Sequence, residues 1–244
     1  MSILTDLTSQ LFIRRITTIK MIKFRYLITL LVLLFATMAI HAQDNRVMLG
    51  LRGGHNVSFG GFGAVSLETE LHLKKHLMIN GGLQYNSIGK TATELHMGYY
   101  HDFDWGRISA EALMAYSHLA SVNNVDLGVG IGISSKWIGG KLGYYYRLFG
   151  KEQNFIKEPF NIYYELSGNL LPMIDKWDLK LIITNCEIFE IERHYQPSFI
   201  AQCDYYMRHG LGVSLGFGCK PAGIFNLSPD YYESYLKFGL CYRW

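Results

Sequence analysis

The chain has 244 residues, of which 18% are charged and 14% are aromatic, and it contains 25 glycines. Its formal charge of +3 is misleading, because five basic residues and one acidic residue precede residue 44. The remaining chain has 18 basic and 19 acidic residues, which gives no reason to expect nucleic-acid binding. Few charges combined with many aromatic residues and glycines favour strands.

The N-terminal segment is organised like a secretory signal peptide. An apolar run over residues 26–40 is shorter than the roughly 20 residues that a spanning helix needs. Lys23 and Arg25 stand just before this run, and Ala42 follows it. A short basic region, an apolar stretch and a small residue at the exit are typical of a signal peptide. We predict cleavage after Ala42; an uncleaved anchor helix is the alternative.

This interpretation divides the chain into three parts. Met21 opens a natural signal peptide, so residues 1–20 are expected to be an over-long gene start. Residues 21–42 are expected to be the signal peptide itself, and residues 43–244 to form the mature domain.

The mature segment shows the period of two that is typical of strands. From residue 65 to residue 73 the odd positions hold Val, Leu, Thr, Leu and Leu, while the even positions hold Ser, Glu, Glu and His. The pattern returns over residues 125–134 and 211–218. It predicts about twelve strands, with ten or fourteen as alternatives, over residues 46–59, 62–73, 77–87, 90–102, 105–118, 124–135, 136–149, 160–171, 176–188, 194–207, 210–220 and 231–244.

Strand length and loop length indicate a membrane barrel. Most of these strands have 11–14 residues, enough for the roughly 9–11 that a tilted spanning strand needs. Short connections, such as residues 74–76 and 208–210, alternate with several longer ones, at 119–124, 149–159, 188–193 and 221–230. Short turns on one rim and long loops on the other are typical of outer-membrane barrels. We predict an all-β fold, a transmembrane antiparallel up-and-down β-barrel.

The chain ends on an alternating strand with an aromatic last residue. Lys237, Gly239, Tyr242 and Trp244 match the fixed places of the C-terminal assembly signal of bacterial outer-membrane proteins, which this segment resembles. The junction Ala42–Gln43 resembles signal peptides of the Bacteroidota. The resemblance implies a small outer-membrane β-barrel of the Bacteroidota type. It would meet the outer-membrane assembly machinery during biogenesis and then outer-membrane lipid.

The charged residues at the polar positions of the alternating strands are expected to line the lumen. Acids fall mainly on the second to sixth predicted strands, and bases on the first and the seventh to twelfth. These strands form an acidic arc and a basic arc of the barrel wall. The two arcs either interlock as ion pairs in a narrow lumen or line an aqueous pore with a transverse electric field. The set comprises Arg52, Glu68, Glu70, Glu94, Glu111, Asp126, Lys141, Arg147, Glu165, Lys180, Lys220, Lys237 and Arg243.

Motifs for chemistry are weak or incomplete. Gly89-Lys90-Thr91 lacks the earlier glycine of a phosphate loop, and no helix is expected after it. His72 and His96 stand near glutamates on the polar parity, but on strands that are not predicted to be neighbours, so no metal is assigned. His118 and Ser121 resemble the pair of outer-membrane lipid esterases, yet no orienting carboxylate or amide can be assigned.

These observations favour a non-enzymatic outer-membrane barrel without a cofactor. It would serve either as a narrow pore for small polar solutes or as a structural and interaction barrel, and the solute stays open. An outer-membrane lipid esterase and a secreted soluble β-barrel that binds a ligand are the alternatives. The spacing of the four cysteines fits no zinc pattern, and whether any of them pair also stays open.

Overall fold

The computed structural model describes residues 45–73, 76–151, 154–174, 176–185, 197–221 and 231–244. The predicted gene start, signal peptide and cleavage site therefore lie outside the described residues, as do the predicted loop at 188–193 and nearly all of the one at 221–230. Among the described residues, no helix has the length and apolar character needed to cross a membrane.

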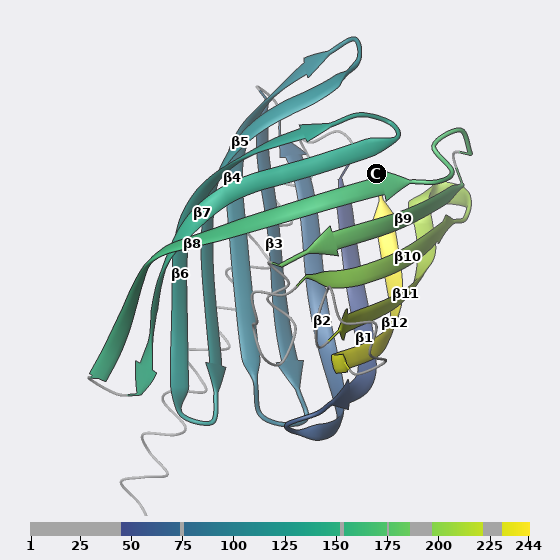
Figure 1. Cartoon of the computed structure of the whole chain (residues 1–244). Coiled ribbons are helices and arrows are strands. Elements are labelled where there is room, and N and C mark those ends of the chain that lie inside the picture. Colours follow the sequence, from purple (N-terminus) through teal and green to yellow (C-terminus); the bar gives the residue numbers. More distant parts are fainter. Residues whose placement is uncertain (1–44, 74–75, 152–153, 175, 186–196, 222–230) are drawn as a thin grey trace, which may run out of the picture. The chain divides into compact units, whose positions relative to one another are not determined.

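Twelve strands account for most of the described chain (Figure 1). Besides them the structure has a short 3-10 helix, Arg208–Gly210. The predicted number of twelve is confirmed, and most bounds agree within a few residues. The strands are β1 (Arg46–Asn56), β2 (Gly60–Leu73), β3 (Leu77–Asn86), β4 (Thr91–Phe103), β5 (Gly106–Leu119), β6 (Val122–Ser134), β7 (Ile138–Lys151), β8 (Asn154–Asn169), β9 (Trp177–Thr184), β10 (Ser198–Tyr206), β11 (Leu211–Pro221) and β12 (Tyr231–Arg243).

The sheet closes on itself. Each strand pairs antiparallel with its neighbours in sequence, and β12 returns to pair with β1. This last register runs from Arg46 opposite Arg243 to Asn56 opposite Glu233. Beyond it, Asn45 and Trp244 exchange backbone hydrogen bonds of 3.0 and 3.1 Å. The predicted pairing of the final strand with the first is confirmed, and closure removes the sheet edges that would otherwise invite aggregation.

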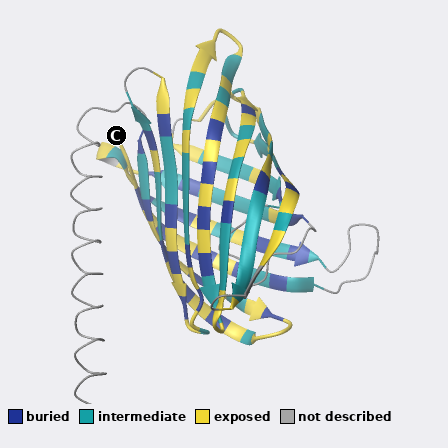
Figure 2. Cartoon of the chain, turned by 90° about the vertical axis from the view of Figure 1, so that its left-hand side faces the viewer, coloured by how far each residue is buried: buried dark blue, intermediate teal, exposed yellow. Residues whose placement is uncertain are grey.

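The alternation along each strand separates an apolar outer face from a polar inner face. On β1, Leu49 and Leu51 are 52% and 57% exposed, whereas Met48 and Arg52 are 1% and 4% exposed. Figure 2 shows this as bands of buried and exposed residues that alternate along the strands. Exposed leucines opposite a buried arginine invert the arrangement of a soluble protein. The structure thus places the apolar face on the outside, as a membrane barrel requires.

Aromatic rings lie at the rim that holds the β6–β7 and β10–β11 turns. Trp177 on β9 packs against Tyr205 on β10 with ring centroids 4.7 Å apart. Tyr242 stacks on Trp244 at 5.4 Å. Aromatic side chains with one apolar and one polar end concentrate at membrane–water boundaries. Their position marks one boundary of the lipid-facing band.

Two of the segments predicted as long loops consist largely of strand. Residues 119–124 were predicted as a loop, but β5 and β6 are joined only by Ala120 and Ser121, with φ of 49° and 72°. Left-handed backbone at both central residues suits a two-residue hairpin turn. The loop predicted at 149–159 is also wrong, because β7 and β8 continue through most of it. Hairpin ends that project past the apolar band need no apolar face, so their sequence loses the period that predicts strands.

Candidate functional site

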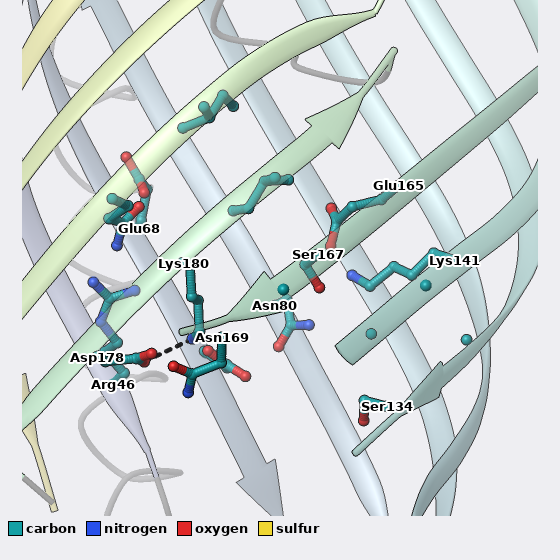
Figure 3. A pocket seen from close by; sticks show the side chains of 18 of the residues that line it. Arg46, Glu68, Asn80, Ser134, Lys141, Glu165, Ser167, Asn169, Asp178 and Lys180 are labelled. Carbon is teal, nitrogen blue, oxygen red and sulfur yellow. Dashed lines mark ion pairs between the residues drawn. The ribbon is translucent and has the colours of Figure 1, made fainter. Parts of the chain in front are cut away.

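A cavity of about 630 Å³ lies in the lumen, near the rim that holds the β6–β7 turn. Its wall is formed by inward-facing side chains of many strands, several of which Figure 3 labels. Eight of the thirteen charged residues expected in the lumen line this cavity: Arg52, Glu68, Glu70, Glu94, Lys141, Glu165, Lys180 and Lys237. The volume falls within the range of about 300–1,000 Å³ that is common for small-molecule sites.

The other five expected lumen residues lie elsewhere. Glu111, Asp126 and Lys220 are buried in the barrel, at 4%, 2% and 1% exposure. Arg147 lies next to Asp126, with its Nε 2.8 Å from Asp126 Oδ1. Arg243 is exposed near the end of β12, where its guanidinium lies 4.1 Å from the ring centroid of Tyr206. The thirteen residues therefore form several groups and not one continuous lining.

Close ion pairs join the acidic arc to the basic arc where the two arcs meet. Lys237 Nζ on β12 lies 2.6 Å from Glu68 Oε2 on β2, reaching across β1. At the other boundary, Arg147 on β7 holds Asp126 on β6 through two guanidinium contacts, at 2.8 and 3.3 Å. Because each pair bridges two strands, charge neutralisation also fixes the strands against each other.

A second group centres on Glu111 of β5. His96 Nδ1 lies 3.3 Å from Glu111 Oε1, and Tyr163 donates a hydrogen bond of 3.2 Å to the same oxygen. The other nitrogen of His96 lies 3.8 Å from Glu94 Oε2. Lys141 Nζ lies 4.0 Å from Glu111 Oε2. Four strands thus meet at one buried carboxylate. Among the described residues, no group of three or more His, Cys, Asp or Glu is arranged to hold a metal ion.

Sequence reasoning missed two cavity-side groups. Arg46 Nη2 on β1 lies 2.5 Å from Asp204 Oδ2 on β10, across two intervening strands. Asp178 pairs with Lys180 at 2.8 Å, an ion pair drawn in Figure 3. Arg46 shares the parity of Arg52, so continuing the count along the first strand would have placed it on the polar face.

Buried tyrosine rings pack inside the barrel beyond the cavity, on the side away from the β6–β7 turn. Tyr163 is 2% exposed and packs with Tyr145, Leu113 and two alanines. Its ring occupies the space where Gly143 would carry a side chain, and its hydroxyl does the same at Gly130. Gly130 of β6 and Gly143 of β7 are therefore required by the close approach of this ring.

A second buried ring, Tyr235 of β12, lies beside the cavity. It is 4% exposed and lies where a side chain at Gly218 of β11 would stand. The guanidinium of Arg52 lies 3.9 Å from the ring centroid, a cation–π contact. Phe62 packs against the same ring. We call Tyr145, Tyr163 and Tyr235 the tyrosine constriction.

The pair considered for an esterase is placed differently from a catalytic pair. His118 lies on the outer face, and its Nδ1 is 3.0 Å from Asn123 Oδ1. The same amide oxygen accepts a 2.8 Å hydrogen bond from Tyr116. Ser121 sits in the β5–β6 turn, and within the described residues no hydrogen bond joins it to His118. Asn123 supplies an orienting amide for His118 that the sequence alone did not reveal, but Ser121 is not hydrogen-bonded to this histidine.

A closed antiparallel barrel with an apolar outside and a charged inside defines the class of transmembrane β-barrels to which porins belong. Comparison with solved structures agrees. The KdgM porin in complex with disordered oligogalacturonate matches with a TM-score of 0.52 at 10% identity, over 82% of this chain and 99% of that one. The NanC porin matches with a TM-score of 0.53 at 10% identity, over 80% of this chain and 100% of that one. No protein-family model and no curated protein matches the sequence.

The ion pair between β2 and β12 generates a stability prediction. Lys237→Met should lower the free energy of unfolding by about 2–3 kcal/mol. The expected loss is below the 3–5 kcal/mol typical of a fully buried pair, because Glu68 keeps 24% side-chain exposure. Adding Glu68→Gln to this variant should restore most of the loss, since no uncompensated carboxylate remains. Denaturant titration of the refolded protein in lipid vesicles measures both effects.

The exposed Lys157 supplies the control, and Lys157→Met should leave the free energy of unfolding unchanged. A double variant no more stable than Lys237→Met alone would contradict the assigned pairing.

Proposed function

We propose that the chain is a non-enzymatic outer-membrane barrel with a narrow pore for small polar solutes. The observation that supports this best is the lumen itself, in which a charged cavity of about 630 Å³ adjoins the tyrosine constriction. Charged walls favour polar solutes. The buried rings keep the passage narrow. The fold shared with the KdgM and NanC porins supports the same conclusion.

Single-channel recording in planar bilayers tests the pore directly. The purified barrel should give small, discrete conductance steps. Tyr163→Ala should raise the conductance several-fold, because it removes the ring that lies across Gly130 and Gly143. Tyr144→Ala is the matched control, since that ring is 49% exposed on the outer face.

Heat-dependent migration on a gel shows whether each variant is folded. If folded protein gives no conductance in the wild type or in Tyr163→Ala, the pore proposal is wrong. The barrel would then be a structural or interaction barrel, a role that the packed part of the lumen favours.

We also propose how the barrel reaches its membrane. Residues 21–42 would act as a signal peptide cleaved after Ala42, supported by Lys23 and Arg25 before the apolar run. The junction at Ala42 supports an origin among small barrels of the Bacteroidota type. Residues Lys237, Gly239, Tyr242 and Trp244 would form the assembly signal. In support, they end the strand that closes the barrel against β1.

Changes at Trp244 test the proposed assembly signal. Deleting Trp244, or adding a charged tail after it, should lower the amount of barrel in the membrane and raise its degradation in the periplasm. Trp244→Phe should have a small effect, because the aromatic boundary character remains. Membrane fractions probed by immunoblotting measure the assembled amount. Normal assembly of the deletion variant would show that the resemblance to the signal is accidental.

A further inference from the structure

The charges inside the barrel are neutralised unevenly. Four of the cations on the basic side hold a carboxylate at contact distance. These close pairs are Lys237–Glu68 at 2.6 Å, Arg147–Asp126 at 2.8 Å, Lys180–Asp178 at 2.8 Å and Arg46–Asp204 at 2.5 Å. A pair at such a distance contributes little net field to the rest of the lumen.

Lys141 is arranged differently, as one ammonium among four carboxylates. Its cross-strand partner on the inner face is Glu165 of β8, and Figure 3 shows both side chains projecting into the cavity. Glu111 Oε2 lies 4.0 Å from its Nζ, and Glu70 and Glu94 also attract it electrostatically. The Lys141 side chain keeps 30% exposure, so it stays in contact with the cavity.

The balance at this point of the lumen is negative. Among the described residues, His96 is the second group that can carry a positive charge in contact with these carboxylates, beside Glu94 and Glu111. Arg46 also attracts Glu70, but its close partner is Asp204, so that ion pair adds no net charge. His72 reaches Glu70 only at 4.0 Å. Four carboxylates therefore face Lys141 and His96, so even with His96 counted as a cation an excess of about two negative charges remains before His72 is counted. A charged group in a narrow, low-dielectric passage concentrates ions of the opposite sign.

We propose that this cluster makes the pore selective for cations and that Lys141 is the residue that limits the selectivity. As a tethered ammonium, Lys141 occupies the position that a permeating cation would take among Glu70, Glu94 and Glu165. The inference rests on the proposed pore function and adds the class of solute, small inorganic or organic cations.

The reversal potential in a KCl gradient measures the selectivity of the folded barrel. Lys141→Gln should raise the K⁺ to Cl⁻ permeability ratio about 25-fold, because one charge about 4 Å away in a water-like dielectric changes the permeability of each ion about fivefold and in opposite directions. Glu165→Gln should lower the ratio. Lys141→Arg should keep the wild-type ratio. Lys157→Gln removes the same charge from an exposed position on β8 and should change nothing.

The outcomes separate the two proposals. A wild-type preference for K⁺ that Lys141→Gln raises and Glu165→Gln lowers supports the inference. Conductance with a preference for Cl⁻, or a ratio that Lys141→Gln shifts no more than Lys157→Gln does, overturns the inference and leaves the pore intact. The absence of conductance in every folded variant, with Tyr163→Ala included, overturns the pore and the inference with it.

Discussion

Lipid offers no hydrogen bonds, and this constraint sets the whole arrangement of the molecule. Every backbone amide and carbonyl within the apolar band must pair inside the protein, which strands achieve only in a closed sheet. The pairing of β12 with β1 completes that closure. Once the wall is closed, strand geometry sends alternate side chains outward and inward, so Leu49 and Leu51 meet lipid while Arg52 is buried.

The interior must then neutralise its own charges within a narrow space. Close pairs such as Lys237–Glu68 bind strands together and leave little free charge. Where pairing is incomplete, around Lys141, the lumen forms a cavity lined by charged and polar side chains. Around Tyr163 the interior is packed with aromatic rings, which fit because the residues facing them are glycines. Cavity, constriction and charge balance are thus three consequences of one enclosed polar interior.

Much of the fold follows from the sequence because the bilayer imposes a strict period. The alternation over residues 65–73 predicts both the strand and its two faces. The hairpin ends at 119–124 and 149–159 were predicted as loops because that period stops beyond the apolar band. Contacts inside the lumen are harder to predict. The alternation places Arg46 on the polar face with the other inward residues. Its pairing with Asp204 depends on the curvature of the barrel, which the alternation does not encode.

The central claim, an apolar face toward lipid and a polar face inward, is tested most directly by spin-label accessibility along β7. Labels placed singly at residues 141, 142, 144 and 145, in a cysteine-free barrel folded in vesicles, would be measured for collision with oxygen and with a water-soluble nickel complex. The account predicts high oxygen collision at Leu142 and Tyr144, in contrast to low values at Lys141 and Tyr145. Collision of the nickel complex at Leu142 and Tyr144 as high as in a soluble protein would contradict it.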